Sequence, residues 1–90
     1  MVKELIEKWK NNLDIDKIVE LWKISRWDIT NERGTRGGSL VGVIQKDNRI
    51  IIIHTRSLTE EDIVHELLHV KYPNWSEEEI RTETSLQLGG

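Results

Sequence analysis

The chain has 90 residues, no cysteine and a formal net charge of −3. This length predicts a single domain over residues 1–90 with a small core, and the lack of cysteine excludes a disulfide framework. Basic and acidic residues are interspersed and the longest apolar run is Ile50–Ile53, so we expect neither a nucleic-acid partner nor a membrane partner. Residues 1–4 lack the apolar stretch of a signal peptide, and the cytoplasm is therefore the expected location.

The first quarter of the chain is predicted to be helical. Apolar residues recur at helical spacing over residues 2–9 and, in a new phase, over residues 15–22, with Asn11–Asn12 between the two stretches. This pattern predicts one broken helix or two short helices over residues 2–23. A DNA-binding helix-turn-helix is disfavoured, because the outer face of the second stretch lacks basic residues.

Three strands are expected in the middle of the chain. Residues 24–30 alternate between apolar and polar side chains, which is typical of a strand. A loop with three glycines follows over residues 31–38. Residues 40–44 and 49–55 are then predicted to form two strands of a β-hairpin, with Lys46–Asn48 between them.

Two helices are predicted in the last third of the chain. Thr59 followed by Asp62 resembles a capping box, and Ser76 followed by Glu79 repeats that pattern. Pro73–Asn74 is expected to end the first of these helices. The predicted architecture is therefore α+β: an N-terminal helical segment, a small three-stranded sheet with a hairpin, and two C-terminal helices.

The first of these helices carries the most specific motif of the chain, H-E-x-x-H at His65–His69. On a helix, His65 and His69 project from one face and can hold a single tetrahedral Zn²⁺ ion. Glu66 would lie beside the open coordination position, where a carboxylate can take a proton from water and pass it to a leaving amine. Apolar neighbours predict that much of the helix is buried, and buried imidazoles need partners, which favours a metal site over a structural pair.

A third metal ligand is expected on the final helix. Catalytic zinc sites generally use three protein ligands, and no further histidine follows the motif. Glu79 and Glu83 flank the helix face that Ile80 marks, so both are candidates. Glu77 and Glu78 are interpreted as part of a solvated acidic first turn that interacts favourably with the helix dipole.

The motif followed by a glutamate-bearing helix resembles the gluzincin group of zinc metallopeptidases, and the short chain is most similar to the minigluzincins. The resemblance extends over about residues 49–88. Glu79 and Glu83 are spaced like the gluzincin ligand glutamate and the acidic residue that orients a histidine ligand, which implies Glu79 on the metal and Glu83 behind His65. The link after the motif is shorter than in large gluzincins, and Glu83 stands where they carry Asp.

By this resemblance, the chain is expected to be a zinc-dependent endopeptidase, a hydrolase whose peptide or protein substrate adds as a strand along a sheet edge. Minigluzincins are self-inhibited zymogens, so the resemblance also implies latency through self-association or self-inhibition. Leu86 and Leu88 could cover the site of their own chain or of a neighbour, or could instead complete the core of the last helix. The alternative function is a catalytically silent metal-binding module with an interaction or structural role.

Overall fold

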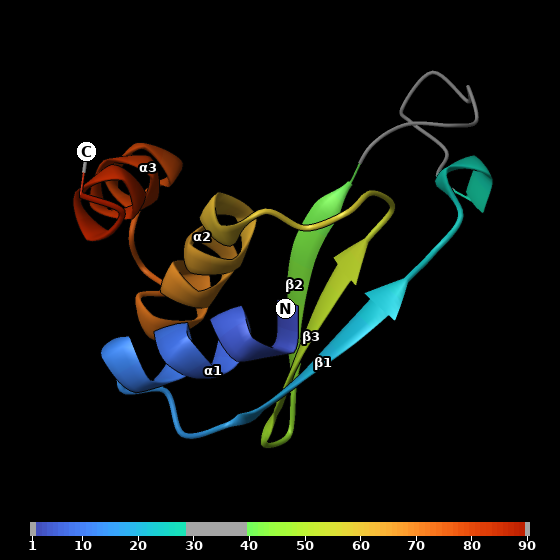
Figure 1. Ribbon diagram of the computed structural model, residues 1–90, viewed down its shortest axis with the longest axis horizontal. Coiled ribbons are helices and arrows are strands. Elements are labelled where there is room, and N and C mark those ends of the chain that lie inside the picture. The colour runs from blue at the N-terminus through green and yellow to red at the C-terminus, as the bar shows by residue number, and fades with distance from the viewer. Residues whose placement is uncertain (1, 29–39, 90) are drawn as a thin grey trace. The chain divides into compact units, whose positions relative to one another are not determined.

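The computed structural model describes residues 2–28 and 40–89, and the predicted loop over residues 31–38 lies outside these ranges. The described residues form an α+β structure, as predicted (Figure 1). None of their helices is long and apolar enough to cross a membrane. The elements, in chain order, are α1 (Val2–Asn12), β1 (Ile18–Lys23), η1 (Arg26–Asp28), β2 (Val41–Lys46), β3 (Arg49–His54), α2 (Glu60–Lys71) and α3 (Glu77–Gln87).

The chain divides into two compact units, which are described separately. A helical unit comprises Met1–Lys17 and Leu58–Gly90, and a sheet unit comprises Ile18–Ser57. In the sheet unit the strand order is β1-β3-β2, with β3 parallel to β1 and antiparallel to β2 (Figure 1). The predicted hairpin is confirmed, and Asp47 in its turn has a φ of 55°, which Asp adopts more readily than most residues. The sheet is therefore mixed, with β1 and β2 at its edges.

The first strand of the sheet is not the predicted one. The helix expected up to residue 23 is wrong from residue 18 onward, where β1 begins, and the strand expected at residues 24–30 is wrong over its described part, where Arg26–Asp28 forms a short 3-10 helix. Short helices are costly to nucleate, whereas the β-branched and aromatic residues of β1 fit a pleated surface. The backbone hydrogen bonds that β3 supplies across the parallel pair decide the outcome.

In the helical unit, α1 lies against α2 (Figure 1), and hydrogen bonds link α1 and the residue after it to the two ends of α2. The Trp9 indole nitrogen donates a hydrogen bond to Glu60 Oε2 at 2.7 Å, and Lys8 Nζ donates to the same oxygen at 3.0 Å. At the other end, Lys71 Nζ donates to the Leu13 carbonyl. Since Glu60 and Lys71 are the first and last residues of α2, these contacts hold the motif helix at both of its ends.

Both predicted capping boxes are confirmed. Thr59 Oγ1 accepts a hydrogen bond from the Asp62 amide at 3.2 Å, and Asp62 Oδ2 accepts from the Thr59 amide at 2.9 Å. Ser76 and Glu79 make the same reciprocal pair at the start of α3, at 3.2 and 3.0 Å. Each box satisfies two amides that a helix start otherwise leaves without partners. Local sequence therefore determines where the two site-bearing helices begin.

We expect Thr59→Ala to lower the free energy of unfolding by about 1 kcal/mol, because the Asp62 amide loses its capping acceptor. Urea denaturation followed by circular dichroism measures this change. Thr82→Ala is the matched control: Thr82 is exposed within α3, its hydroxyl donates only to the Glu78 carbonyl, and alanine is the better helix former. An equal loss of stability in the two variants would contradict the capping role.

Candidate metal centre

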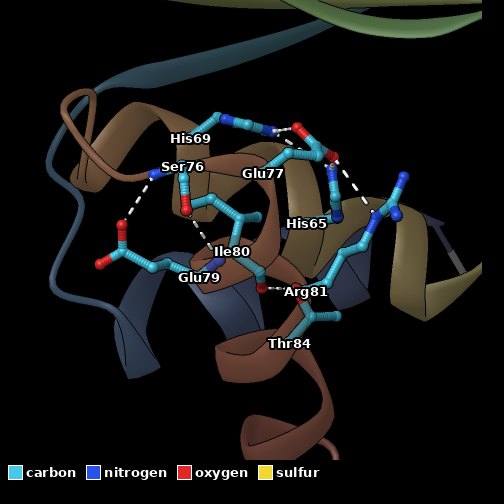
Figure 2. Close-up of polar contacts among 8 residues, drawn as sticks. All are labelled: His65, His69, Ser76, Glu77, Glu79, Ile80, Arg81 and Thr84. Atoms are coloured by element: carbon cyan, nitrogen blue, oxygen red, sulfur yellow. Dashed lines mark hydrogen bonds and ion pairs between the residues drawn. The ribbon is translucent and has the colours of Figure 1, made fainter.

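The two motif histidines meet one carboxylate from the next helix. His65 Nε2 and His69 Nε2 lie 3.2 Å apart on α2. Glu77, the first residue of α3, places Oε1 at 2.7 Å from His65 Nε2 and Oε2 at 3.0 Å from His69 Nε2 (Figure 2). Because the ligand atoms of these three residues all lie within 4.8 Å of one another, they can converge on a single cation.

The connection between the helices brings these groups together. Only residues 72–76 separate α2 from α3. The Tyr72 ring stacks on the Trp75 ring at a centroid distance of 3.9 Å, and the Trp75 amide donates to the Tyr72 carbonyl at 3.1 Å. This tight turn is followed directly by the Ser76 cap, so the first turn of α3 returns beside the last turns of α2.

The buried face of α3 sets the direction of Glu77. Ile80 and Thr84 are 0% and 3% exposed, and the Thr84 hydroxyl donates to the Ile80 carbonyl at 2.7 Å. Glu77 precedes Ile80 by three residues, which places the two on the same side of the helix. Packing of that side therefore also fixes the side of α3 from which the Glu77 carboxylate projects.

The donor set and spacing of the group suit a divalent metal ion, and zinc provides a reference geometry. Four ligands arranged tetrahedrally at 2.0–2.1 Å from Zn²⁺ are about 3.3 Å apart from one another. The distance of 3.2 Å between the two imidazole nitrogens is close to this value. A different oxygen of Glu77 contacts each imidazole, at 2.7 Å for His65 and 3.0 Å for His69, so a single oxygen would have to shift to serve as the ligand beside both histidines. The Glu77 side chain is 51% exposed and can make this shift.

The central residue of the motif, Glu66, has a perturbed acidity. Its side chain is buried, at 7% exposure. This burial, together with the negative charges of Glu77 and Asp62, raises the pKa of Glu66 to about 7. A carboxyl group with such a pKa can exchange a proton near neutral pH. A divalent cation held by the His–Glu group would favour the ionised form and so oppose this shift.

The structure brings His65 and His69 together as predicted but groups them with Glu77 instead of Glu79 or Glu83. The interpretation of Glu77 as merely solvated is therefore corrected. Glu79 Oε1 accepts from the Ser76 amide in the capping box, so its use as a ligand would require loss of that cap and stays a prediction. Glu83 Oε2 accepts from Gln87 at 2.7 Å, and among the described residues it makes no contact with His65.

Two features of the sequence could have identified Glu77. The Ser76–Glu79 capping box already assigned the Glu79 carboxylate to a backbone amide. The spacing from Ile80 also favours Glu77, because a residue three positions before a buried one lies on the same helix side, whereas Glu79 is rotated by about 100°. Glu83 lies about 9 Å further along the helix axis than Glu77. Only the return angle of α3 could not be inferred from these patterns.

Comparison of the chain with family models, curated proteins and solved structures finds no match. The resemblance to gluzincins consequently rests on the motif and its neighbours. Function must be argued from the geometry of the site itself, which consists of His65, His69 and Glu77 with Glu66 beside them.

We expect Glu77→Gln to weaken zinc binding more than 100-fold, because it replaces a direct carboxylate ligand; loss of an indirect partner usually costs 10- to 100-fold. His65→Ala and His69→Ala should be at least as damaging. Competition with a chromophoric chelator measures the affinity.

The matched control for this test is Glu78→Gln, since Glu78 is exposed in the same first turn but does not belong to the histidine group. It should bind zinc within a few-fold of the wild type. A larger loss of affinity in Glu79→Gln than in Glu77→Gln would transfer the ligand role to Glu79.

A pH dependence follows from the pKa of Glu66 in the metal-free protein. Between the ordinary value of 4.5 and about 7, the native state keeps a proton on Glu66 that the unfolded state has lost. The unfolded state then binds fewer protons, so this residue makes the free energy of unfolding fall as pH rises from about 5 to 7. Urea denaturation at several pH values in the presence of a chelator measures the effect.

Glu66→Gln should remove this part of the pH dependence, so the wild type should lose stability relative to the variant across that window. Glu61→Gln, at an exposed position of the same helix, is the control for removal of one carboxylate. A stability difference between wild type and Glu66→Gln that stays constant from pH 5 to 7 would contradict the assignment.

Proposed function

We propose that this chain is a zinc-dependent endopeptidase that hydrolyses peptide bonds. The observation that carries the proposal is the convergence of His65, His69 and Glu77, whose ligand atoms all lie within 4.8 Å of one another. Two histidines and one glutamate are a donor set of catalytic zinc sites, which keep a further position open. When bound, zinc polarises the scissile carbonyl and lowers the pKa of water to about 7.

The residues of the chain would bind the ion and transfer the protons of the reaction. His65, His69 and Glu77 hold the ion. Glu66 accepts a proton from the attacking water at its carboxylate and delivers a proton to the leaving amine. The position of Glu66 supports this role, because its buried carboxyl group lies close enough to Glu77 to be influenced by the charge of that carboxylate. The resemblance to gluzincins supports the same assignment.

The substrate is proposed to be an extended peptide that adds as a strand to the sheet. Both β1 and β2 are edge strands, so each has one side that is not paired within the sheet. Main-chain hydrogen bonds made there would recognise a peptide with little regard to its side chains. A cytoplasmic location remains part of the proposal, since the cysteine-free composition suits a reducing compartment.

Latency is the second part of the proposal. Leu86 and Leu88 near the end of α3 are 61% and 38% exposed, which contradicts the alternative that they complete a core. Exposed leucines are favourable to bury, and their contact with the site of the same chain or of a neighbour would restrain activity. Restraint between molecules would weaken on dilution, whereas restraint within one chain would not.

We expect Glu66→Gln to retain zinc and the fold while peptide hydrolysis falls by about 10²- to 10⁴-fold, because the proton shuttle is lost and no ligand is removed. Cleavage of a quenched fluorescent peptide, measured at several protein concentrations beside zinc content, tests this and reveals latency between molecules. Glu61→Gln should cleave normally. Stoichiometric zinc without cleavage at any dilution, both in the wild type and in a Leu86→Ser/Leu88→Ser variant that lacks the restraining leucines, would favour the silent metal-binding module.

A further inference from the structure

One cationic side chain lies beside the histidine–glutamate group. Arg81, one turn after Glu77 on α3, extends toward the Glu77 carboxylate (Figure 2). Its Nε lies 3.8 Å from Glu77 Oε1, beyond hydrogen-bonding distance, and its side chain is 75% exposed. Within residues 2–28 and 40–89, neither terminal Nη nitrogen of Arg81 has a hydrogen-bond acceptor. The outer edge of this guanidinium group is therefore free to receive a ligand.

The outer edge of the Arg81 guanidinium group is chemically suited to bind a carboxylate. A guanidinium group presents two parallel N–H donors that match the two oxygens of a carboxylate, and this bidentate pairing is stronger than a single neutral hydrogen bond. The loose, exposed pair with Glu77 contributes little to stability. The ion pair with Glu77 therefore does not by itself explain why an arginine occupies position 81.

The distance to the metal position fits a peptide. An ion about 2 Å from the Glu77 carboxylate and an Nε at 3.8 Å from Oε1 place the guanidinium group within about 6 Å of the ion. In a peptide, the C-terminal carboxylate carbon is three bonds from the carbonyl carbon of the preceding residue, roughly 3–4 Å away. A carbonyl held at the ion would therefore bring a carboxylate of the next residue within reach of Arg81.

We propose that Arg81 is a specificity-determining residue that binds a substrate carboxylate on the residue following the scissile bond. That carboxylate is the side chain of an acidic residue, as an endopeptidase requires, or the C-terminus of the peptide, in which case the chain would remove the last residue and act as a carboxypeptidase. The inference rests on the proposed function and adds a substrate class to it: peptides that carry a negative charge directly after the cleaved bond.

Binding tests this directly and without turnover. The zinc-loaded Glu66→Gln protein is titrated, by calorimetry, with three acetylated alanine tetrapeptides. One has a free C-terminal carboxylate, one has a C-terminal amide, and one is an amide with a single internal glutamate. We expect at least one carboxylate peptide to bind ten-fold or more tightly than the neutral amide. A preference for the glutamate peptide identifies an acidic side chain. A preference for the free acid identifies the C-terminus and changes the proposed reaction from internal cleavage to removal of the last residue.

Variants of Arg81 assign the effect. Arg81→Gln in the same background should abolish the carboxylate preference while zinc affinity and binding of the neutral amide stay within a few-fold, and Arg81→Lys should retain part of the preference. Lys3→Gln, which removes a charge from an exposed position on α1, is the control and should keep the preference.

The outcomes separate this inference from the function on which it rests. Equal binding of all three peptides, no measurable binding, or a preference that survives Arg81→Gln would overturn the role of Arg81, even if the wild type cleaves neutral peptides. Survival of the preference would mean that a group other than Arg81, such as the metal or another basic side chain, binds the carboxylate. Failure of the His–Glu group to hold zinc would overturn the proposed function and this inference together.

Discussion

The short connection between α2 and α3 is the constraint on which the candidate metal centre depends. Residues 72–76 cannot extend away from α2, because the Tyr72 and Trp75 rings stack across the turn and α3 begins directly after the Ser76 cap. The first residue of α3 must then lie near the last turns of α2, where the motif histidines are. With a longer connection, no local interaction would hold Glu77 within 3.0 Å of both imidazoles.

The same cluster of negative charge explains two properties of the site. Glu77 contacts both imidazoles, and its charge adds to the burial that raises the pKa of Glu66. Without a cation, the Glu77 carboxylate is stabilised by its contacts with the two histidines, and Glu66 is stabilised by keeping its proton. A divalent cation would take the place of both the histidine contacts of Glu77 and the proton on Glu66, since it neutralises the local negative charge. Metal affinity and the protonation of Glu66 are therefore two outcomes of one electrostatic arrangement.

Prediction from sequence succeeded where an interaction spans only a few residues. The two capping boxes, the hairpin and the one-turn spacing of His65 and His69 each depend on neighbours along the chain. It failed at β1, whose apolar residues fit both helical and extended periods until β3 supplies hydrogen bonds. It also passed over Glu77, because an acidic first turn is usually explained by the helix dipole alone.

The sequence by itself therefore determined the α+β class, the start of each site-bearing helix and the pair of imidazoles on one helix face. Tertiary structure decided which carboxylate meets them and that Arg81 lies beside that carboxylate. The physical reason is that helix periodicity fixes positions only within one element. The meeting of two elements also depends on the angle of the connecting turn, which no local pattern encodes.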